Sequence, residues 1–300
     1  MQVGMVGLGR MGGNMTQRLL RGGHEVVAWA RTRASVDEAA DHGAVPADSL
    51  EDLVVKLAAP RTVWLMIPAG PPTADTVEQL TDLLQRGDTI IDGGNSRYTE
   101  SMQRAATLKE HGIEFVDAGT SGGIWGLENG YCLMIGATDE TFARLEPIFS
   151  TLAPDNGYAR VGPPGAGHFV KMVHNGIEYA LMQAYGEGLE LLNASDFDLD
   201  LASVAEVWRH GSVVRSWLLD LIARALSNDP KLESITGYVE DSGEGRWTVE
   251  TAIDNAVPTP AIAQALFQRF ASRQDESFSN KVIAALRKEF GGHAVRSKEQ

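Results

Sequence analysis

The chain opens with a glycine pattern that leaves few folds open to its first half. Gly7-Leu8-Gly9-Arg10-Met11-Gly12 directly follows an apolar run at Val3–Val6. In such a G-x-G-x-x-G pattern the first glycine makes a tight turn, the second lets the backbone reach a pyrophosphate, and the third lets a helix pack on a strand. The free N–H groups of that helix then face the phosphates. The pattern predicts a dinucleotide-binding strand–turn–helix; the alternative is a glycine turn without a ligand.

Short apolar runs alternate with helix-length segments through the first half of the chain. The runs stand at 3–6, 26–29, 63–67, 89–91, 115–117 and 132–135. Strands that alternate with helices are typical of βαβ units on a parallel sheet. We therefore predict an α/β domain with a doubly wound sheet of the Rossmann type over residues 1–164.

The second half has a different pattern, which begins after the cluster Gly162-Pro163-Pro164-Gly165. Such clusters mark loops and boundaries between elements. Beyond it we find little strand signal. The helix-compatible segments span 168–193, 199–210, 213–226, 249–255, 259–272 and 278–290. We therefore predict an all-α domain over residues 165–300.

The residues after the second apolar run bear on the choice of cofactor. A site for NAD usually places an acidic residue about 20 residues after the glycines, where it holds the ribose 2′-hydroxyl. This chain has Ala30-Arg31-Thr32-Arg33 there, and the next acid is Asp37. Arginine and threonine suit a 2′-phosphate, so the sequence favours NADP over NAD. The alternative is that Arg31 and Arg33 are solvated loop charges.

Charge and cysteine content exclude several classes of function. The net charge of −14, from 40 acidic and 26 basic residues, disfavours binding to nucleic acid or to an anionic membrane surface. Cys132 is the one cysteine, which we expect in the core of a strand, so no internal disulfide can form. No apolar run approaches the ~18–20 residues that span a bilayer, and no leader pattern precedes the first strand. We expect a cytoplasmic protein.

One helical segment carries most of the chemistry. Lys171, His174, Asn175 and Glu178 stand at i, i+3, i+4 and i+7, which places them on one helix face with Tyr179 at its edge. We expect this helix to be largely buried. Burial lowers the pKa of a lysine and raises that of a glutamate, which gives the forms that a general base and a general acid need. A buried Lys–Glu ion pair in a structural helix is the alternative. The apolar positions on the rest of the helix are Phe169, Val173, Ile177, Ala180 and Leu181.

Polar loops follow two of the predicted strands. Asp92-Gly93-Gly94-Asn95-Ser96 comes after 89–91, and Gly119-Thr120-Ser121-Gly122-Gly123 comes after 115–117. Ligands of open α/β sheets bind outside the carboxyl ends of the strands, so Asn95 is well placed to contact one. The glycines expose backbone N–H groups that suit a carboxylate. Plain glycine turns are the alternative.

The helical half also holds cations that could meet an anion. Arg215, Arg246 (with Thr248 nearby) and Arg287 lie in it, although a solvated arginine is the usual case. Gly291-Gly292 follows the last helical segment and lets the chain turn, which would bring His293 back beside Arg287. Reaching into the anion site of a neighbouring chain would give Arg287 a bidentate partner. The sequence offers no cluster of metal ligands.

From Gly7 to His293 the chain resembles the 6-phosphogluconate dehydrogenase family, in a short form that lacks a C-terminal helical repeat. The motifs that carry the resemblance are Gly7-Leu8-Gly9-Arg10-Met11-Gly12, Asp92-Gly93-Gly94-Asn95, Thr120-Ser121-Gly122-Gly123, Lys171-Met172-Val173-His174-Asn175-Gly176-Ile177-Glu178-Tyr179, Val214-Arg215-Ser216, Gly245-Arg246-Trp247-Thr248 and Phe290-Gly291-Gly292-His293. The run from Lys171 to Tyr179 is the most specific of them. Family members often have lysine where Arg246 stands, and NADP users often have asparagine where Ala30 stands.

The resemblance implies the oxidative decarboxylation of 6-phospho-D-gluconate to D-ribulose 5-phosphate and CO2 with reduction of NADP or NAD, in the pentose phosphate pathway and gluconate utilization. It implies that Lys171 is the general base and Glu178 the general acid, without a metal. It also implies a homodimer or homotetramer whose sites are shared between chains.

The resemblance extends to the binding residues. Substrate contacts are expected at Asn95, Ser121, Gly122, Gly123, His174, Asn175, Tyr179, Arg215, Arg246, Thr248, Arg287 and His293, with the last two supplied by a second subunit. Cofactor contacts are expected at Gly7, Leu8, Gly9, Arg10, Met11, Gly12, Arg31, Thr32 and Asn95.

Two other functions remain open at this point. The 3-hydroxyisobutyrate-type β-hydroxyacid dehydrogenases share the nucleotide domain and the helical lysine but do not decarboxylate. They typically have asparagine where His174 stands, and they lack the Glu178-Tyr179 pair. A non-enzymatic NADP-binding sensor would need neither Lys171 nor Glu178 on one helix face.

Overall fold

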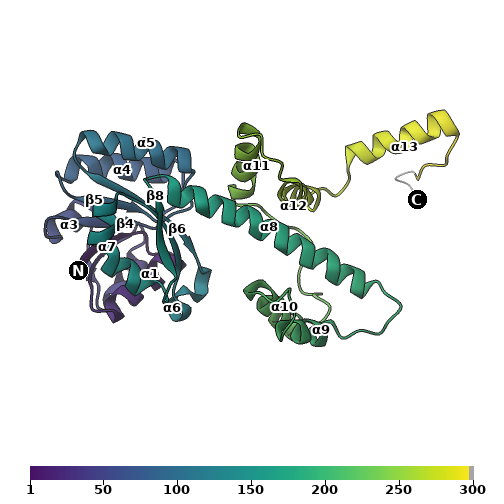
Figure 1. Ribbon diagram of the computed structural model, residues 1–300, viewed down its shortest axis with the longest axis horizontal. Helices are drawn as coiled ribbons and strands as arrows, with labels where there is room; N and C mark the ends of the chain where they lie inside the picture. Colours follow the sequence, from purple (N-terminus) through teal and green to yellow (C-terminus); the bar gives the residue numbers. More distant parts are fainter. Residues whose placement is uncertain (297–300) are drawn as a thin grey trace. The chain divides into compact units, whose positions relative to one another are not determined.

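The computed structural model describes residues 1–296, and the chain separates into two compact units (Figure 1). The first unit comprises Met1–His174, and the second begins at Asn175. Helix α8 (Ala166–Asn193) starts in the first unit and continues into the second.

An eight-stranded sheet forms the centre of the first unit, in the order β3-β2-β1-β4-β5-β6-β7-β8. The strands are β1 (Gln2–Val6), β2 (Glu25–Trp29), β3 (Val45–Pro46), β4 (Thr62–Leu65), β5 (Thr89–Asp92), β6 (Glu114–Ser121), β7 (Cys132–Gly136) and β8 (Tyr158–Gly162). Neighbouring strands run parallel except β6 and β7, so the prediction of a parallel sheet is wrong for this one pair. The segment 122–131 between β6 and β7 is shorter than the dozen or so residues of a parallel crossover, and the chain turns back.

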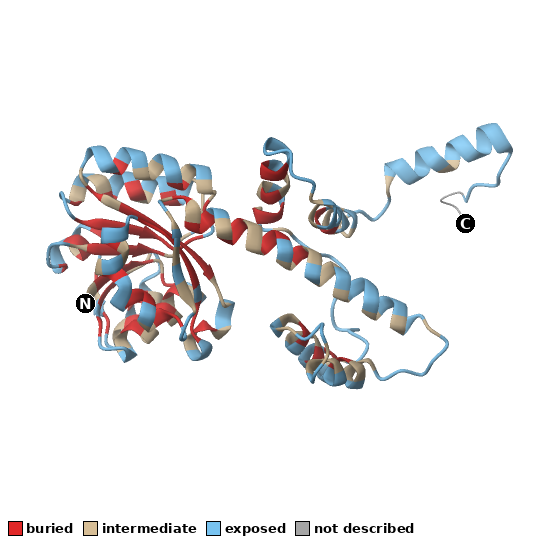
Figure 2. Ribbon diagram, viewed as in Figure 1, coloured by how far each residue is buried: buried red, intermediate tan, exposed pale blue. Residues whose placement is uncertain are grey.

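Helices cover both faces of this sheet. They are α1 (Arg10–Arg21), α2 (Arg33–Asp41), α3 (Leu50–Lys56), α4 (Pro71–Leu83), α5 (Tyr98–Glu110), the short α6 (Gly126–Asn129) and α7 (Asp139–Leu152). One core joins Met5 of β1 to Met15 of α1 and Phe149 of α7. The core on the opposite face joins Val6, the next residue of β1, to Leu53 of α3. Both faces of the sheet are therefore buried (Figure 2), which confirms the doubly wound α/β fold.

Two strands have no counterpart among the predicted ones. β3 has two residues and contains Pro46, and β8 lies at the other end of the sheet with alternately exposed residues. Neither position has the continuous apolar run that marks a strand buried on both faces. Both are edge strands, which the pattern of buried runs cannot reveal.

The second unit is helical, as predicted. After α8, its helices are α9 (Leu201–Arg209), α10 (Trp217–Asn228), α11 (Glu244–Asp254), α12 (Pro260–Ala271) and α13 (Phe278–Gly291). No strand occurs between Pro163 and Arg296, the last residue that the structure describes. None of the helices formed by the described residues is long and apolar enough to cross a membrane.

Two expectations about burial are wrong. Cys132, expected in the core, is exposed at the start of β7. Helix α8 is not largely buried, because Phe169, Ile177 and Leu181 are 37%, 51% and 45% exposed. The pattern of apolar residues marks the surface that needs covering, but it does not say whether the same chain covers it.

The first turn of α8 lies against β6 and β7 at a contact that requires glycine. A Cβ atom on Gly167 would lie 2.5 Å from the carbonyl oxygens of Asp117 and Met134. A Cβ atom on Gly119 of β6 would lie 2.6 Å from the Cβ atom of Lys171. Because backbone atoms form most of this contact, side-chain rotation cannot relieve a clash.

We expect Gly167→Ala to lower the free energy of unfolding by about 2–3 kcal/mol, since the added methyl group must displace strand backbone. Gly186→Ala is the matched control on the same helix. No atom would lie within 4 Å of its added Cβ atom. Alanine is the better helix former by about 0.5–1 kcal/mol, so this variant should be slightly more stable. Urea unfolding followed by circular dichroism measures both, and equal stabilities would contradict the close contact.

Candidate active site

The glycine turn between β1 and α1 has the geometry of a pyrophosphate cradle. Gly7 has a φ of +94°, and a Cβ atom there would lie 2.4 Å from the carbonyl oxygen of Met66. A Cβ atom on Gly12 would lie 2.0 Å from the carbonyl oxygen of Gly7, whereas one on Gly9 would meet nothing within 4 Å. Gly9 is the N-cap of α1 and has no side chain to satisfy the first N–H groups. Close packing at Gly7 and Gly12 with open space at Gly9 fits a bound dinucleotide.

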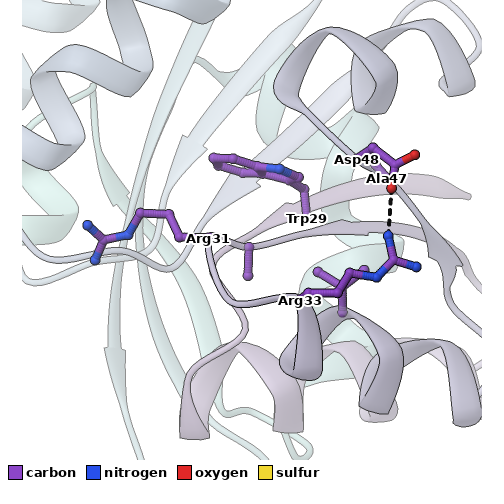
Figure 3. Close-up of a pocket in the computed structure, with 7 residues that line it drawn as sticks. Trp29, Arg31, Arg33, Ala47 and Asp48 are labelled. Atoms are coloured by element: carbon purple, nitrogen blue, oxygen red, sulfur yellow. Dashed lines mark hydrogen bonds and ion pairs between the residues drawn. The ribbon is translucent and has the colours of Figure 1, made fainter.

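A pocket of about 250 Å³ lies at the carboxyl end of β2 (Figure 3). It is lined by Trp29, Ala30, Arg31, Arg33, Val36, Ala47 and Asp48. Arg33 donates to Asp37 (Nε to Oδ1, 2.8 Å) and to Asp48 (NH1 to Oδ1, 2.6 Å), and these bonds raise the pKa of its guanidinium. In Figure 3 Arg31 points away from Arg33 and Asp48. Asp48 is not among the residues predicted from the sequence, because it lies in the segment after β3, a strand that was not predicted.

A buried carboxylate fixes the loop at the end of β5. Asp92 accepts hydrogen bonds from the N–H of Gly94 (3.1 Å) and from Ser96 Oγ (2.7 Å). Arg104 of α5 pairs with the same carboxylate at 3.3 Å. These bonds anchor the residues on both sides of Asn95, whose exposed side chain stands at the tip of the loop.

Asp117 of β6 caps the helix that carries Lys171. This carboxylate is fully buried and accepts the backbone N–H groups of Gly165 (2.6 Å) and His168 (2.7 Å) at the start of α8. Burial raises its pKa, against the opposing effect of His168 and of these hydrogen bonds. His168 is held in turn by a 2.7 Å hydrogen bond between its Nδ1 and Ser101 Oγ. Neither Asp117 nor His168 was singled out in the sequence.

These bonds set the position of Lys171 in the first unit. Lys171 is 7% exposed and lies against Gly119 of β6, the strand that ends at Ser121. Beyond it Gly122 and Gly123 have φ of +126° and +54°, which glycine tolerates. The neighbouring strands β5 and β6 run parallel. The first unit therefore brings Lys171 and the predicted loops to the carboxyl ends of these strands.

The second unit gathers another group of the predicted residues around α8 and α11. Asn175, 8% exposed, donates from Nδ2 to Glu244 Oε1 at 3.0 Å. A Cβ atom on Gly176 would lie 2.7 Å from Thr248 Cγ2, so the two helices pack closely there. The guanidinium carbon of Arg269 lies over the Tyr179 ring, 3.6 Å from the ring centroid. Glu244 is 2% exposed and was missed, because nothing in the sequence distinguishes a buried glutamate at the start of a helix from a solvated one.

Arg246 is held by an acidic residue. Asp241 accepts from its Nε (2.8 Å) and NH2 (3.0 Å), and from Arg273 NH2 (2.8 Å). The Arg246 hydrogen bonds, with a further contribution from Arg273, lower the pKa of the nearly buried Asp241 carboxyl to about 2. The guanidinium also lies 4.4 Å from the ring centroid of Phe270. Arg246 is thus a pre-positioned, half-exposed cation.

Three of the predicted cationic residues are exposed. Arg215 lies in the turn before α10, and Arg287 and His293 lie at the end of α13, a helix with no buried residue. Gly292 is left-handed, with a φ of +62°, and the N–H of His293 bonds the carbonyl of Arg287 at 3.4 Å. The expected turn thus brings His293 back towards Arg287. Glu178 is half-buried on α8, which is helical throughout and keeps the spacing from Lys171. Within residues 1–296 no group of three or more His, Cys, Asp or Glu side chains is arranged to hold a metal ion.

The comparisons with known proteins agree over both units. The model of the NAD binding domain of 6-phosphogluconate dehydrogenase matches residues 2–162, and that of the C-terminal domain of 6-phosphogluconate dehydrogenase matches residues 167–300. The NAD(+)-dependent, decarboxylating 6-phosphogluconate dehydrogenase of Haloferax volcanii is 46% identical, with 100% of both chains covered. YqeC of Bacillus subtilis, named as a 6-phosphogluconate dehydrogenase in provisional terms, is 47% identical over 99% of this chain and 100% of its own.

A solved structure extends the similarity to the fold. The 6-phosphogluconate dehydrogenase of Plasmodium falciparum, described in its apo form and in complexes with NADP+ and with 6-phosphogluconate, superposes with a TM-score of 0.83 at 27% identity. The match covers 100% of this chain and 67% of that one. The chain thus matches some relatives over their whole length and a longer one over about two thirds.

We expect Asp241→Asn to lower the free energy of unfolding by about 2 kcal/mol at pH 7, because one pKa unit is worth about 1.4 kcal/mol. A depressed pKa stabilises the fold above the unfolded value, about 3.9, and the effect is lost as the pH falls through the folded value. The difference from wild type should therefore shrink between about pH 4 and pH 2. Urea unfolding across this range measures it. Asp75→Asn, exposed on α4, is the control, and a pH-independent difference would contradict the ion pair.

Proposed function

The chain belongs to the 6-phosphogluconate dehydrogenase family of NAD(P)-binding oxidoreductases, and from this premise we propose that it oxidises and decarboxylates 6-phosphogluconate to ribulose 5-phosphate and CO2 in the pentose phosphate pathway. The observation that carries the proposal is the buried Lys171, held against β6 on a continuous helix that also presents Glu178. In this proposal residues 1–164 bind the nucleotide, and residues 165–300 bind substrate and a second subunit.

The glycine turn would hold the cofactor. The N–H groups at the start of α1 and the open space at Gly9 suit the pyrophosphate, and Asn95 stands at the carboxyl end of β5. When bound, the nicotinamide ring accepts a hydride from C3 of the substrate. Arg31 and Thr32, both exposed at the end of β2, are the groups that would favour a 2′-phosphate and hence NADP.

Lys171 is the proposed general base. In its amine form it takes the proton of the C3 hydroxyl during oxidation, which leaves a 3-keto acid. The bond between C1 and C2 then breaks, CO2 leaves, and the electron pair moves to the carbonyl oxygen at C3. Lys171 returns its proton to that oxygen, which gives an enediol. Nearly complete burial keeps water from competing for these proton transfers.

Glu178 is the proposed general acid for the last step. It protonates the carbon that becomes C1 of ribulose 5-phosphate, while Lys171 takes the hydroxyl proton of the enediol. Ser121, Gly122 and Gly123 would hold the carboxylate end of the substrate with His174 and Asn175. Glu244 fixes the side-chain amide of Asn175 for this contact.

The phosphate end would meet the cations of the second unit. Arg246 has fork geometry suited to a phosphate and is already held in place by Asp241 and Phe270. Tyr179, Thr248 and Arg215 are the other proposed contacts. The half-exposed guanidinium leaves donors for a ligand.

We expect wild-type protein to release CO2 in equimolar amount with reduced cofactor from 6-phosphogluconate, and Lys171→Met to lose a factor of about 10²–10⁴ or more in kcat because the general base is gone. Initial rates with NADP and NAD, with trapping of CO2, measure both. Binding of the reduced cofactor should be nearly unchanged.

Lys109→Met, an exposed lysine of α5, is the matched control and should keep wild-type rates. Reduced cofactor without CO2 would point to a β-hydroxyacid dehydrogenase that does not decarboxylate. Cofactor binding without turnover of any hydroxyacid would point to a sensor. Wild-type kcat in folded Lys171→Met would exclude Lys171 as the base.

We further propose a homo-oligomer in which Arg287 and His293 complete the site of a second chain. Helix α13 has no buried residue although it carries a stripe of apolar side chains. The stripe consists of Phe278, Val282, Ile283, Leu286 and Phe290, each at least 41% exposed. Ile177 and Leu181 on α8 are also uncovered. Apolar surface of this extent is typical of an interface between chains.

We expect co-expressed Lys171→Met and Arg287→Ala chains to recover up to about a quarter of wild-type activity. Random pairing gives about half heterodimers, each with one intact site of two. Each variant alone should be nearly inactive. Heterodimers isolated from this mixture with two different affinity tags should have about half of the wild-type activity, since one of their two sites is intact. Inactive heterodimers would show that Arg287 acts in its own chain's site or in none.

A further inference from the structure

The pocket at the end of β2 has a wall made of an arginine and a carboxylate that neutralise each other. Arg33 donates through NH1 to Asp48 at 2.6 Å (Figure 3). It also donates through Nε to Asp37 at 2.8 Å. Arg33 and Asp48 both line the pocket, whereas Asp37 pairs with Arg33 from α2 without lining it. Asp48 thus contributes a negative charge to the pocket wall, whereas Asp37 only anchors the guanidinium.

The Arg33–Asp48 pair affects an anion differently from a neutral hydroxyl. A 2′-phosphate that approaches Arg33 would meet the Asp48 carboxylate, which occupies one arm of the guanidinium and repels the phosphate. A ribose 2′-hydroxyl carries no charge and can donate to a carboxylate. The Arg33 and Asp48 side chains are 60% and 78% exposed, so solvent weakens their pair and Arg33 can change partner.

We propose that Asp48 is a specificity-determining residue of the nucleotide site, which limits the preference for NADP by holding Arg33 and placing a carboxylate in the pocket wall. The acid that NAD-binding sites carry at the end of the second strand is here supplied by the segment that follows β3. The preference between NADP and NAD then results from two opposing contributions. Arg31 and Thr32 favour binding of the 2′-phosphate, and Asp48 disfavours it. This inference rests on the nucleotide site of the proposed function.

The test measures binding without turnover. NADPH and NADH differ only in the 2′-phosphate, and their fluorescence reports binding to the full-length protein in the absence of substrate. We expect Asp48→Asn to tighten NADPH about three- to tenfold, because Arg33 is released and a like charge is removed, while NADH changes by less than about twofold. The gain should shrink at high salt, since the groups are exposed.

Asp37→Asn is the matched control: it removes the same charge and the other partner of Arg33, but at a position that does not line the pocket. It should change the ratio of the two dissociation constants by less than about twofold. Adding Arg33→Ala to Asp48→Asn should abolish the gain. Because the Asp48 side chain is largely exposed, the variant should fold, and its thermal midpoint checks this.

Three results would overturn the proposal. The ratio of the NADPH and NADH dissociation constants could stay at the wild-type value in Asp48→Asn. Asp37→Asn could shift it equally, which would reduce the effect to net charge. The gain could survive Arg33→Ala. If neither nucleotide binds the wild type, the nucleotide site itself fails, and the proposed function fails with it; if NADPH and NADH bind but the ratio does not respond, only the role of Asp48 is wrong.

Discussion

The contact between the first turn of α8 and the sheet is the constraint on which the rest of the site depends. Gly119, Gly136 and Gly167 leave no room for a side chain between helix and strands, and Asp117 bonds the free N–H groups at the start of the helix. A buried carboxylate is costly unless it is hydrogen-bonded, and a helix start needs acceptors. The N–H groups of the helix start supply donors to the Asp117 carboxylate, and the carboxylate supplies the acceptors that the helix start needs. These contacts fix the first turn of α8 against the sheet and hence the position of Lys171 in the first unit.

The sequence predicted what depends on local pattern. The glycine turn with its strand and helix is specified within twelve residues, and the helical half is marked by periodicity and breakers. The residues that were missed act across long separations. Asp117 meets His168, Asn175 meets Glu244, and Arg33 meets Asp48, which follows an unpredicted edge strand. Their sequence neighbours do not distinguish them from surface charges, because their role comes from the partner.

The burial of α8 could not be predicted for a different reason. Apolar residues at helical spacing indicate a face to be covered, and the single chain covers only part of it. Tyr179 packs with Ala265 and Leu266, whereas Ile177 and Leu181 remain exposed. Hydrophobic periodicity reports the sum of intrachain and interchain burial. Apolar spacing therefore predicts more buried residues than a single chain buries when its own helices and strands do not cover all of its apolar stripes.

The acidic character of the chain explains how its cations are presented. With a net charge of −14, arginines tend to have carboxylate neighbours, as Arg246 has Asp241, Arg104 has Asp92 and Arg33 has Asp48. Such a pair positions the guanidinium and lowers its side-chain entropy before an anion arrives. It also competes with that anion. The Asp241 side chain is nearly buried and that of Arg246 half-exposed, so at the proposed phosphate site we expect positioning to outweigh competition. Where the carboxylate lines the pocket itself, as Asp48 does, competition dominates and the pair selects between ligands that differ in charge.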